Sequence, residues 1–172
     1  MGYNRTAAPI ESNDPADKTV KLLPLEVAVL RALRQIEAAH FPGYEMCGKT
    51  DRFNFVVMGL VGKNINDLRK SLPGQKFSLN SAIHIGIHSL SGIGEIHQAG
   101  DIKPANMCIG RDPADLRGVY ILDWGMCRKY VDDNGQLHKR RIKAAFRGTP
   151  YYCSVNALFC VDQGRVDDVW AW

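Results

Sequence analysis

The chain has 172 residues, of which 45% are hydrophobic and 23% charged. This composition excludes wholesale disorder and suits a single globular domain. The formal net charge of +4 is too small to indicate nucleic acid binding, which we do not expect. No signal peptide precedes the first apolar segment and no apolar run approaches the roughly 18 residues of a membrane helix, so no membrane association is predicted.

The five cysteines are scattered and form no Cys-x-x-Cys pair. An odd count without that spacing argues against a disulfide framework or a zinc cage. The pattern indicates a reducing intracellular setting, either cytoplasmic or nuclear. We expect Cys153 and Cys160 to be small buried hydrophobic residues rather than reactive thiols.

The first half of the chain predicts one helix and one strand. Residues 1–18 are polar and contain two prolines, so we expect irregular chain there. Apolar residues then recur at helical spacing and predict a helix over residues 24–38, ended by Pro42-Gly43. The β-rich run of residues 52–58 predicts a strand. The glycine-containing residues 59–63 would connect this strand to the next element.

The second half predicts helices and a hairpin. A short helix is expected over residues 64–72, and Ser78 would cap a longer one over residues 79–97. The β-rich runs 107–109 and 119–122 flank a loop rich in turn residues and predict a β-hairpin. The apolar residues of the longer helix share one stripe, which consists of Leu79, Ile83, Ile87, Leu90 and Ile93.

Strands before the connector and helices after it predict an α+β fold with two lobes. Residues 1–58 would form the small lobe, residues 59–63 the hinge and residues 64–172 the large lobe.

Two short segments carry residues suited to phosphoryl transfer. That reaction needs a carboxylate to orient the attacking hydroxyl, a cation near the γ-phosphate, and oxygen ligands for magnesium. Asp101, Lys103 and Asn106 supply one of each within six residues. The segment Asp123-Trp-Gly125 follows an apolar strand, and the hairpin would bring Asp123 beside Asn106. Mg²⁺ prefers oxygen ligands, so these two residues are a candidate pair of magnesium ligands.

Three other features admit two interpretations. His84 and His88 lie four apart on the predicted helix and suit a metal, but no third ligand is evident, so packed or partly exposed histidines are the alternative. The basic run of residues 139–143, with Arg147, suits either a phosphate on an acidic substrate or a solvated loop. For Trp124 we expect hydrophobic packing, and displacement of its loop by the large indole is the alternative.

Asp-x-Lys-Pro-x-Asn followed by Asp-Trp-Gly resembles the catalytic loop and the magnesium loop of eukaryotic protein kinases. Phe146 to Asn156 resembles the end of the activation segment in the casein kinase I superfamily, which has Ser-x-Asn where most kinases have Ala-Pro-Glu. Four further segments look most like the tau-tubulin kinase branch: 25–30, 51–58, 64–69 and 164–170.

The resemblance implies a serine/threonine protein kinase domain that uses ATP and Mg²⁺ and acts on a protein substrate, either acidic or already phosphorylated. It implies that Asp101 orients the substrate hydroxyl, that Lys103 stabilises the transferring phosphoryl group, and that Asn106 and Asp123 hold Mg²⁺. The other implied roles are pairing with a strand lysine for Glu26, facing adenine for Met58 to Leu60, support of the catalytic loop for Thr149, and anchoring of that loop for Asp168.

The sequence also departs from the family pattern. No glycine-rich loop precedes Glu11, Pro9 stands where the family has the strand lysine, and Gly100 runs directly into Asp101 where the family has His-Arg before the aspartate. The chain ends at Trp172, where the family's central helix begins. We therefore expect both lobes to be truncated and the chain to be a weak or inactive kinase fragment, with exposed apolar faces along residues 79–90 and around Trp170. The alternatives are a pseudokinase that binds acidic or phosphorylated partners, and a non-functional gene fragment.

Overall fold

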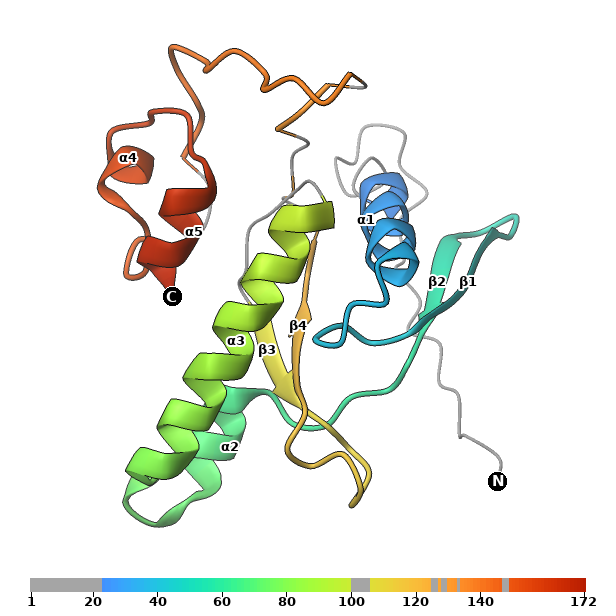
Figure 1. Ribbon diagram of the computed structural model, residues 1–172. Coiled ribbons are helices and arrows are strands. Elements are labelled where there is room, and N and C mark those ends of the chain that lie inside the picture. Colours follow the sequence, from blue (N-terminus) through green and yellow to red (C-terminus); the bar gives the residue numbers. More distant parts are fainter. Residues whose placement is uncertain (1–22, 100–105, 125–126, 128–129, 133, 147–148) are drawn as a thin grey trace.

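The computed structural model describes residues 23–99, 106–124, 127, 130–132, 134–146 and 149–172. The segment predicted to form the small lobe contains helix α1 (Leu23–Gln35) and the antiparallel strands β1 (Tyr44–Lys49) and β2 (Asn54–Met58). The segment predicted to form the large lobe contains α2 (Ile65–Ser71), the 3₁₀ turn η2 (Pro73–Gln75), α3 (Leu79–Ala99), β3 (Asn106–Ile109), β4 (Val119–Leu122), α4 (Val155–Leu158) and α5 (Arg165–Ala171). Helix α3 has the β3–β4 hairpin along one side and α5 on the other (Figure 1).

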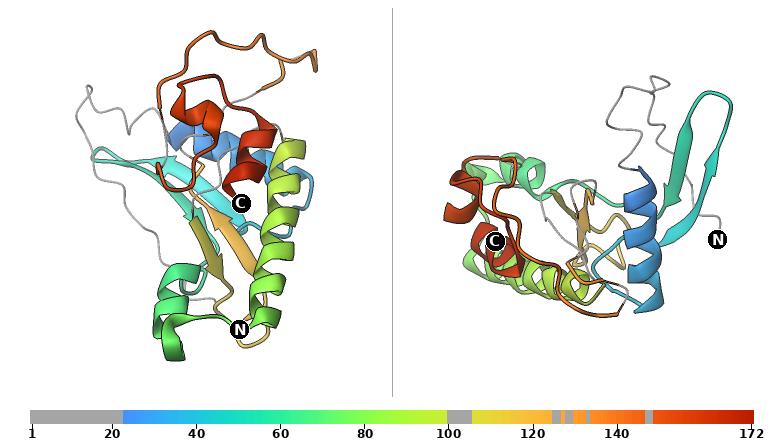
Figure 2. Two further views of the ribbon diagram at one scale, coloured as in Figure 1. Left: turned by 90° about the vertical axis from the view of Figure 1, so that its left-hand side faces the viewer. Right: turned by 90° about the horizontal axis from the view of Figure 1, so that it is seen from above.

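The core lies where α1, α3 and β4 meet. Leu30 and Leu33 of α1 are 2% and 1% exposed, and Ile93 and Ile96 of α3 are each 1% exposed. Ile121 of β4 is fully buried between them. Viewed from above, α1 and the β1–β2 hairpin lie on one side of α3, and α4 and α5 lie on the other (Figure 2). Burial of these side chains thus joins the lobes through one continuous core.

Most predicted elements are confirmed, with shifts at their ends. The first helix was expected to reach residue 38 but ends at Gln35. Glu37 has a left-handed φ of 52°, and the Ala38 N–H donates to the Leu33 carbonyl at 3.0 Å. This bonding pattern closes a helix before the following proline is reached. Helices α2 and α3 and the β3–β4 hairpin form where they were expected, and the Ser78 hydroxyl accepts from the Ser81 N–H at 3.2 Å.

Strand β1 was not predicted, because its sequence lacks an apolar run. It is formed by Tyr-Glu-Met-Cys-Gly-Lys and pairs with β2, so that Gly48 faces Phe55. A Cβ atom on Gly48 would lie 2.5 Å from the ring of Phe55. The aromatic ring therefore covers the glycine, and this cross-strand packing compensates for its low strand propensity.

The apolar stripe of α3 is only partly buried. Ile93 is in the core, but Leu79, Ile83, Ile87 and Leu90 are 78%, 52%, 60% and 41% exposed. Trp170 is 65% exposed on α5. The expected exposed apolar faces are therefore confirmed. No helix among the described residues is long and apolar enough to cross a lipid bilayer.

Two cysteine predictions fail. Cys160 is exposed and Cys153 is only partly buried. Cys160 has a left-handed φ of 54° after α4, where its N–H donates to the Ala157 carbonyl at 3.1 Å and its carbonyl accepts from the Ala144 N–H at 2.8 Å. The backbone N–H and carbonyl of Cys160 are thus both hydrogen-bonded, while the residue as a whole is exposed.

The connector after β2 is bonded to the large lobe through Gly62. The Gly62 N–H donates to the Ile109 carbonyl at 2.7 Å, and a Cβ atom at this position would lie 2.6 Å from the Gly110 carbonyl oxygen. The lobe boundary at residues 59–63 remains a prediction.

Replacing Gly62 with alanine is expected to lower the free energy of unfolding by about 1–3 kcal/mol, because backbone atoms cannot move aside as a side chain can. Gly43→Ala is the matched control, because a Cβ atom there meets nothing within 4 Å. Denaturant unfolding measures both variants, and equal stabilities would contradict the close approach at Gly62.

Candidate active site

The β3–β4 hairpin positions the candidate magnesium ligands. The antiparallel register places Asn106 opposite Leu122, the residue before Asp123. Asp123 leaves the strand with a left-handed φ of 71°, and its side chain is exposed. The hairpin therefore brings the backbones of Asn106 and Asp123 to the same end of the ladder, as predicted. An amide oxygen and a carboxylate at one strand end are donors of the kind that Mg²⁺ accepts.

Trp124 holds the start of this loop against the core. Its side chain is 2% exposed, and its ring centroid lies 5.9 Å from that of Phe41. The interpretation of Trp124 as a packing residue is confirmed. Its indole N–H is buried and has no hydrogen-bond partner among the described residues.

Glu26 of α1 lies close enough to Asp123 to feel its charge. Burial raises the pKa of the Glu26 carboxyl, and the negative charge of Asp123 raises that pKa further. Two carboxylates from different lobes therefore share one electrostatic environment. A cation between them would relieve this repulsion, so the arrangement fits a magnesium ion beside Asp123.

Glu26→Gln is expected to stabilise the chain at pH 7, by a few tenths to about 1 kcal/mol, because it removes one of the two like charges. A carboxyl whose pKa is raised on folding destabilises the folded state increasingly as the pH rises through its folded pKa. The stabilising effect should therefore shrink as the pH falls toward 4, where the native carboxyl is protonated. Thermal melts at pH 4, 5 and 7 measure this, and a pH-independent difference would show that Glu26 and Asp123 do not interact.

The structure describes only some of the remaining predicted site residues. Met58 ends β2, packs against the core and is partly buried, and Leu60 is 44% exposed in the connector. Thr149 is exposed, and its carbonyl accepts from the Tyr152 N–H at 3.1 Å. Asp101, Lys103 and Arg147 lie outside the described residues, as does the side chain of Asn106. The roles inferred for all of these residues remain predictions.

Asp168 is buried on α5 and bonds to the end of α3. Its Oδ2 atom lies 3.1 Å from His97 Nε2. The His97 carbonyl accepts from the Tyr130 hydroxyl at 2.7 Å. Asp168 thus fixes the helix turn that precedes the segment containing Asp101, although its predicted contact with that segment lies outside the described residues.

Asp167 is a site that sequence reasoning missed. It accepts hydrogen bonds from the Ser154 hydroxyl, from Asn156 Nδ2 at 3.0 Å and from the Gly164 N–H at 2.7 Å. Burial raises the pKa of Asp167, but these hydrogen bonds and the charge of Arg140 outweigh burial and hold the pKa below its usual value. The Ser-x-Asn motif at residues 154–156 is therefore bonded to α5, and Asp at the third helical position of α5 was the available signal.

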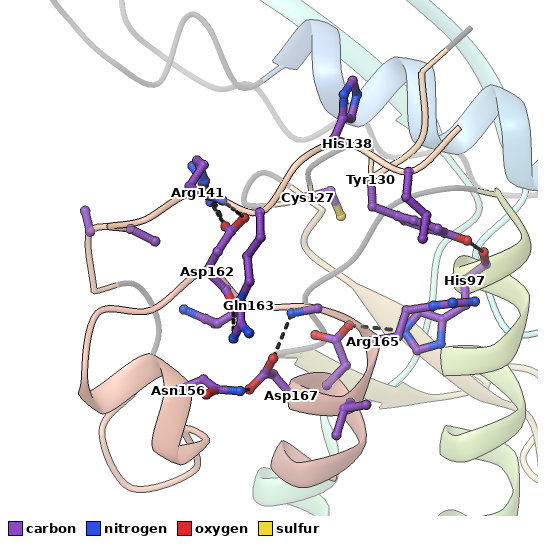
Figure 3. A pocket seen from close by; sticks show the side chains of 17 residues that line it. His97, Cys127, Tyr130, His138, Arg141, Asn156, Asp162, Gln163, Arg165 and Asp167 are labelled. Atoms are coloured by element: carbon purple, nitrogen blue, oxygen red, sulfur yellow. Dashed lines mark hydrogen bonds and ion pairs between the residues drawn. The ribbon is translucent and has the colours of Figure 1, made fainter. Parts of the chain in front are cut away.

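A cavity of about 780 Å³ lies between residues 127–145 and α5 (Figure 3). Arg141 on its rim forms an ion pair with Asp162, with Nη2 2.6 Å from Oδ1, and the Arg141 backbone N–H donates to Oδ2 at 2.8 Å. Part of the basic run is thus fixed by a buried carboxylate. The guanidinium of Arg165 lies 5.1 Å from the ring centroid of Tyr130. Neither Glu26 nor Asp123 lines this cavity, so it is separate from the candidate magnesium site.

The histidine pair of α3 packs against a third histidine that was not foreseen. His88 Nδ1 lies 3.0 Å from His40 Nε2, and the rings of His84 and His88 have centroids 4.3 Å apart. Even so, no group of three or more histidine, cysteine or acidic residues in the described part of the chain is arranged to hold a metal. His84 and His88 are both packed and partly exposed.

Comparison with known proteins identifies the family. The chain is 37% identical over 155 residues to the serine/threonine-protein kinase spe-6 of Caenorhabditis elegans, covering 88% of this chain and 40% of that protein. It is 30% identical over 147 residues to the inactive tau-tubulin kinase ttbk-6 of the same organism, covering 78% of this chain and 51% of that protein. No family model matches the chain.

The structure of vaccinia related kinase 3 superposes with a TM-score of 0.66 at 18% identity and covers 86% of this chain and 47% of that one. This likeness shows the fold, a two-lobed protein kinase arrangement of helices and strands, and confirms the predicted fold class. The chain spans about a quarter to a half of the length of the curated relatives it matches. The chain belongs to the serine/threonine protein kinases, within the casein kinase I-like group that includes the tau-tubulin kinases.

Proposed function

We propose that this chain is part of a kinase domain whose whole protein transfers the γ-phosphoryl group of Mg-ATP to protein hydroxyls. The observation that supports this proposal most directly is the register of the β3–β4 hairpin, which places Asp123 at a strand end with Asn106 across the ladder. The family resemblance implies that these two residues are magnesium ligands. When bound, Mg²⁺ would neutralise charge on the nucleotide phosphates. Asp123 and Asn106 would hold the ion.

The other residues of the proposed site bind and orient the substrates. Met58 and Leu60 would line the adenine side of the cleft. Lys103 would meet the transferring phosphoryl group, and Asp101 would orient the acceptor hydroxyl and take up its proton. Thr149 would hold this geometry from the activation segment, while Asp168 would fix the approach to the loop through His97, which it contacts at 3.1 Å.

We expect the chain itself to have little or no turnover. Burial and the charge of Asp123 raise the pKa of the Glu26 carboxyl, whereas the family resemblance implies a lysine partner for this glutamate. Gly100 is followed immediately by Asp101, and a displacement of the catalytic carboxylate by about 1 Å can reduce the rate roughly 100-fold. Nucleotide binding through the magnesium ligands is less sensitive to both losses than chemistry is.

The cavity beside α5 favours a second function, the binding of acidic or phosphorylated protein segments. Its carboxylates are already bonded: Asp162 to Arg141, Asp167 to Ser154 and Asp168 to His97. Arg165, which lines the cavity, forms no ion pair with any described residue. The three arginines of the lining, Arg140, Arg141 and Arg165, balance its three carboxylates in formal charge, and the exposed Arg165 is the cation that a phosphate group could reach.

An intracellular location, in the cytoplasm or nucleus, completes the proposal. It is supported by the five cysteines, none of which forms a disulfide among the described residues, because disulfides are uncommon in reducing compartments.

Thermal melting with Mg-ATP tests the proposed site. The melting temperature should rise with nucleotide concentration when Mg²⁺ is present and should not rise when EDTA replaces it. A radiolabel transfer assay with an acidic protein substrate should give no phosphate incorporation above background. A cooperative melt that is unmoved by millimolar Mg-ATP would refute nucleotide binding.

The second function has a separate test. A phosphoserine peptide with acidic neighbours should bind more tightly than its unphosphorylated form, and Arg165→Gln should remove that preference. Lys49→Gln is the control, because this exposed cation lies on β1 in the other lobe. Equal binding of the two peptides to the unmodified chain would eliminate the phosphate-binding function without bearing on Mg-ATP.

A further inference from the structure

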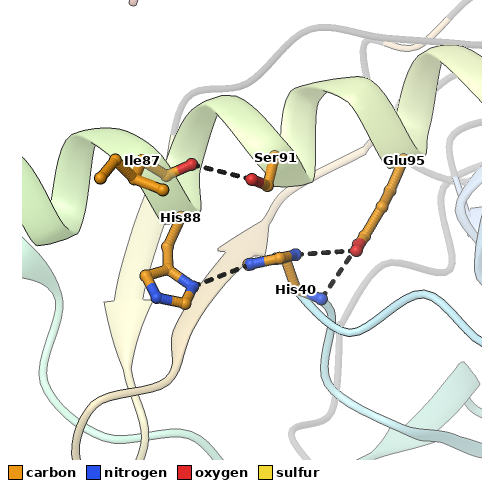
Figure 4. A network of polar contacts seen from close by, with 5 residues as sticks. All are labelled: His40, Ile87, His88, Ser91 and Glu95. Atoms are coloured by element: carbon orange, nitrogen blue, oxygen red, sulfur yellow. Dashed lines mark hydrogen bonds and ion pairs between the residues drawn. The ribbon is translucent and has the colours of Figure 1, made fainter.

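His40 connects three elements through its ring and its backbone. It lies in the loop between α1 and β1. Its backbone N–H donates to Glu95 Oε2 at 3.0 Å, and its ring Nδ1 lies 2.8 Å from Glu95 Oε1 (Figure 4). Its carbonyl accepts from the Ile121 N–H at 2.9 Å. One small-lobe residue is thus bonded to both α3 and β4 of the large lobe.

The close approach of His40 to α3 depends on Gly92. A Cβ atom on Gly92 would lie 2.9 Å from the Cβ atom of His40 and 2.8 Å from Cδ1 of Ile121. The glycine gives the loop room to lie against the helix. The ring of His40 is 13% exposed and the side chain of Glu95 is 22% exposed, so water reaches the contact only in part.

The His40–His88 contact has room for one shared proton. Because the Glu95 carboxylate only accepts, His40 Nδ1 carries a hydrogen. The 3.0 Å separation of His40 Nε2 and His88 Nδ1 then requires one hydrogen between the rings. When both rings are neutral, His88 Nδ1 carries this hydrogen and donates it to His40 Nε2. An added proton can reside on His40 beside Glu95, with His40 donating to His88. A second added proton would set two N–H groups against each other.

The surroundings of His88 also oppose its protonation. Burial lowers the pKa of His88, and the charges of His84 and His40 lower it further. His84 Nε2 donates to the Arg117 carbonyl at 2.8 Å, which holds its ring beside His88. The titratable groups that face the contact are thus His40 from the loop, and His84 and Glu95 from α3. Glu95 supplies the negative charge, and it bonds to the far side of His40 rather than to His88.

We propose that the His40–His88 contact is a proton-sensitive junction between the two lobes. It remains closed when the two rings share a proton and opens when both become imidazolium ions. In the open state His40 leaves α3, and its carbonyl releases the Ile121 N–H. The proton goes to His88 Nδ1, which no longer accepts from His40.

The sign of the pH dependence follows from the direction of the shift. A histidine with a lowered pKa in the closed state binds its proton more tightly once the contact is open. The closed state therefore has its full stability relative to the open state above pH 6.5, the ordinary pKa of histidine. This stability decreases as the pH falls below that value. Single-proton linkage limits the change to about tenfold per pH unit.

Opening would reach the candidate magnesium loop through neighbouring residues. Phe41 follows His40, is 6% exposed and packs on Trp124. Ile121 lies two residues before Asp123. Acidification would thus loosen the support of the loop that carries Asp123 from both sides.

Amide hydrogen exchange, measured by NMR on the full chain, tests the junction. After correction for the intrinsic pH dependence, protection of the Ile121 amide should fall about tenfold between pH 6.5 and pH 5.5. The Gly62 amide, which donates to Ile109 at 2.7 Å within the connector, serves as the internal reference and should not change. His88→Gln, which can donate to His40 but cannot titrate, should abolish the loss of protection at Ile121. His84→Gln, which leaves both contact rings in place, should retain it.

Histidine ring ¹⁵N shifts on the unmodified chain provide a second readout that needs no variant. Uptake of the second proton by the His40–His88 pair should coincide with the loss of Ile121 protection. A pair in which both rings are imidazolium ions while Ile121 stays protected would overturn the proposal, and so would an unchanged pH dependence in a folded His88→Gln chain.

Discussion

Asp167→Ala is expected to lower the free energy of unfolding by about 3 kcal/mol, because it strands buried groups that were bonded to a charge. Ser154 is 5% exposed and Asp167 is 8% exposed. The variant leaves the Ser154 hydroxyl, the Asn156 amide and the Gly164 N–H without this acceptor. Denaturant unfolding at pH 7 provides the measurement.

The pH dependence of this variant separates the charge of Asp167 from its packing. A carboxyl with a lowered folded pKa stabilises the protein above its unfolded pKa of about 3.9 and loses that contribution as the pH falls through the folded pKa. The difference in the free energy of unfolding between the native chain and Asp167→Ala should therefore become smaller below about pH 4. Asp112→Ala on the exposed β3–β4 turn is the control and should be nearly neutral. An Asp167→Ala chain as stable as this control would disprove the structural role.

Asp123→Asn is expected to abolish most of the Mg²⁺-dependent stabilisation by nucleotide. The amide lacks the negative charge that a hard divalent cation requires, and we expect the affinity for Mg-ATP to fall by at least about tenfold, as losses around metal sites commonly do. Magnesium-dependent shifts in melting temperature measure the change at several nucleotide concentrations. The same variant removes the negative charge that raises the pKa of Glu26, so that pKa should fall in the ligand-free chain.

That pair of effects makes the Asp123→Asn experiment selective. A misfolded variant would lose its cooperative melt without nucleotide, whereas this one should melt cooperatively, show a lower pKa for Glu26 and lose its ligand response. Asp112→Asn is the matched control and should respond to Mg-ATP as the native chain does. An unchanged nucleotide response in Asp123→Asn would place the magnesium site elsewhere.

Local sequence signals predicted the elements that have strong internal periodicity or caps. Helix α2 begins where Asn64 caps it, with its side chain accepting from the Asp67 N–H at 2.8 Å. The β3–β4 hairpin follows from two β-rich runs around a turn. The end of α1 could not be read in the same way, because Glu37 adopts a left-handed conformation that glutamate seldom favours.

The features that sequence reasoning missed depend on partners distant in the chain. Strand β1 is stabilised by the ring of Phe55 across the ladder rather than by its own residues. His40 gains its role from Glu95, which is 55 positions away, and Asp167 gains its role from Ser154, 13 positions away. Single-sequence patterns report local preference, whereas these contacts are set by the packing of the lobes.

The exposed residues Leu79, Ile83 and Ile87 on α3 also have a consequence for handling the isolated chain. Sulfate and phosphate salts are excluded from protein surfaces and strengthen the association of apolar groups. Early precipitation by ammonium sulfate is therefore expected, together with light scattering that grows with protein concentration. Dilute chloride buffers suit this molecule better than phosphate.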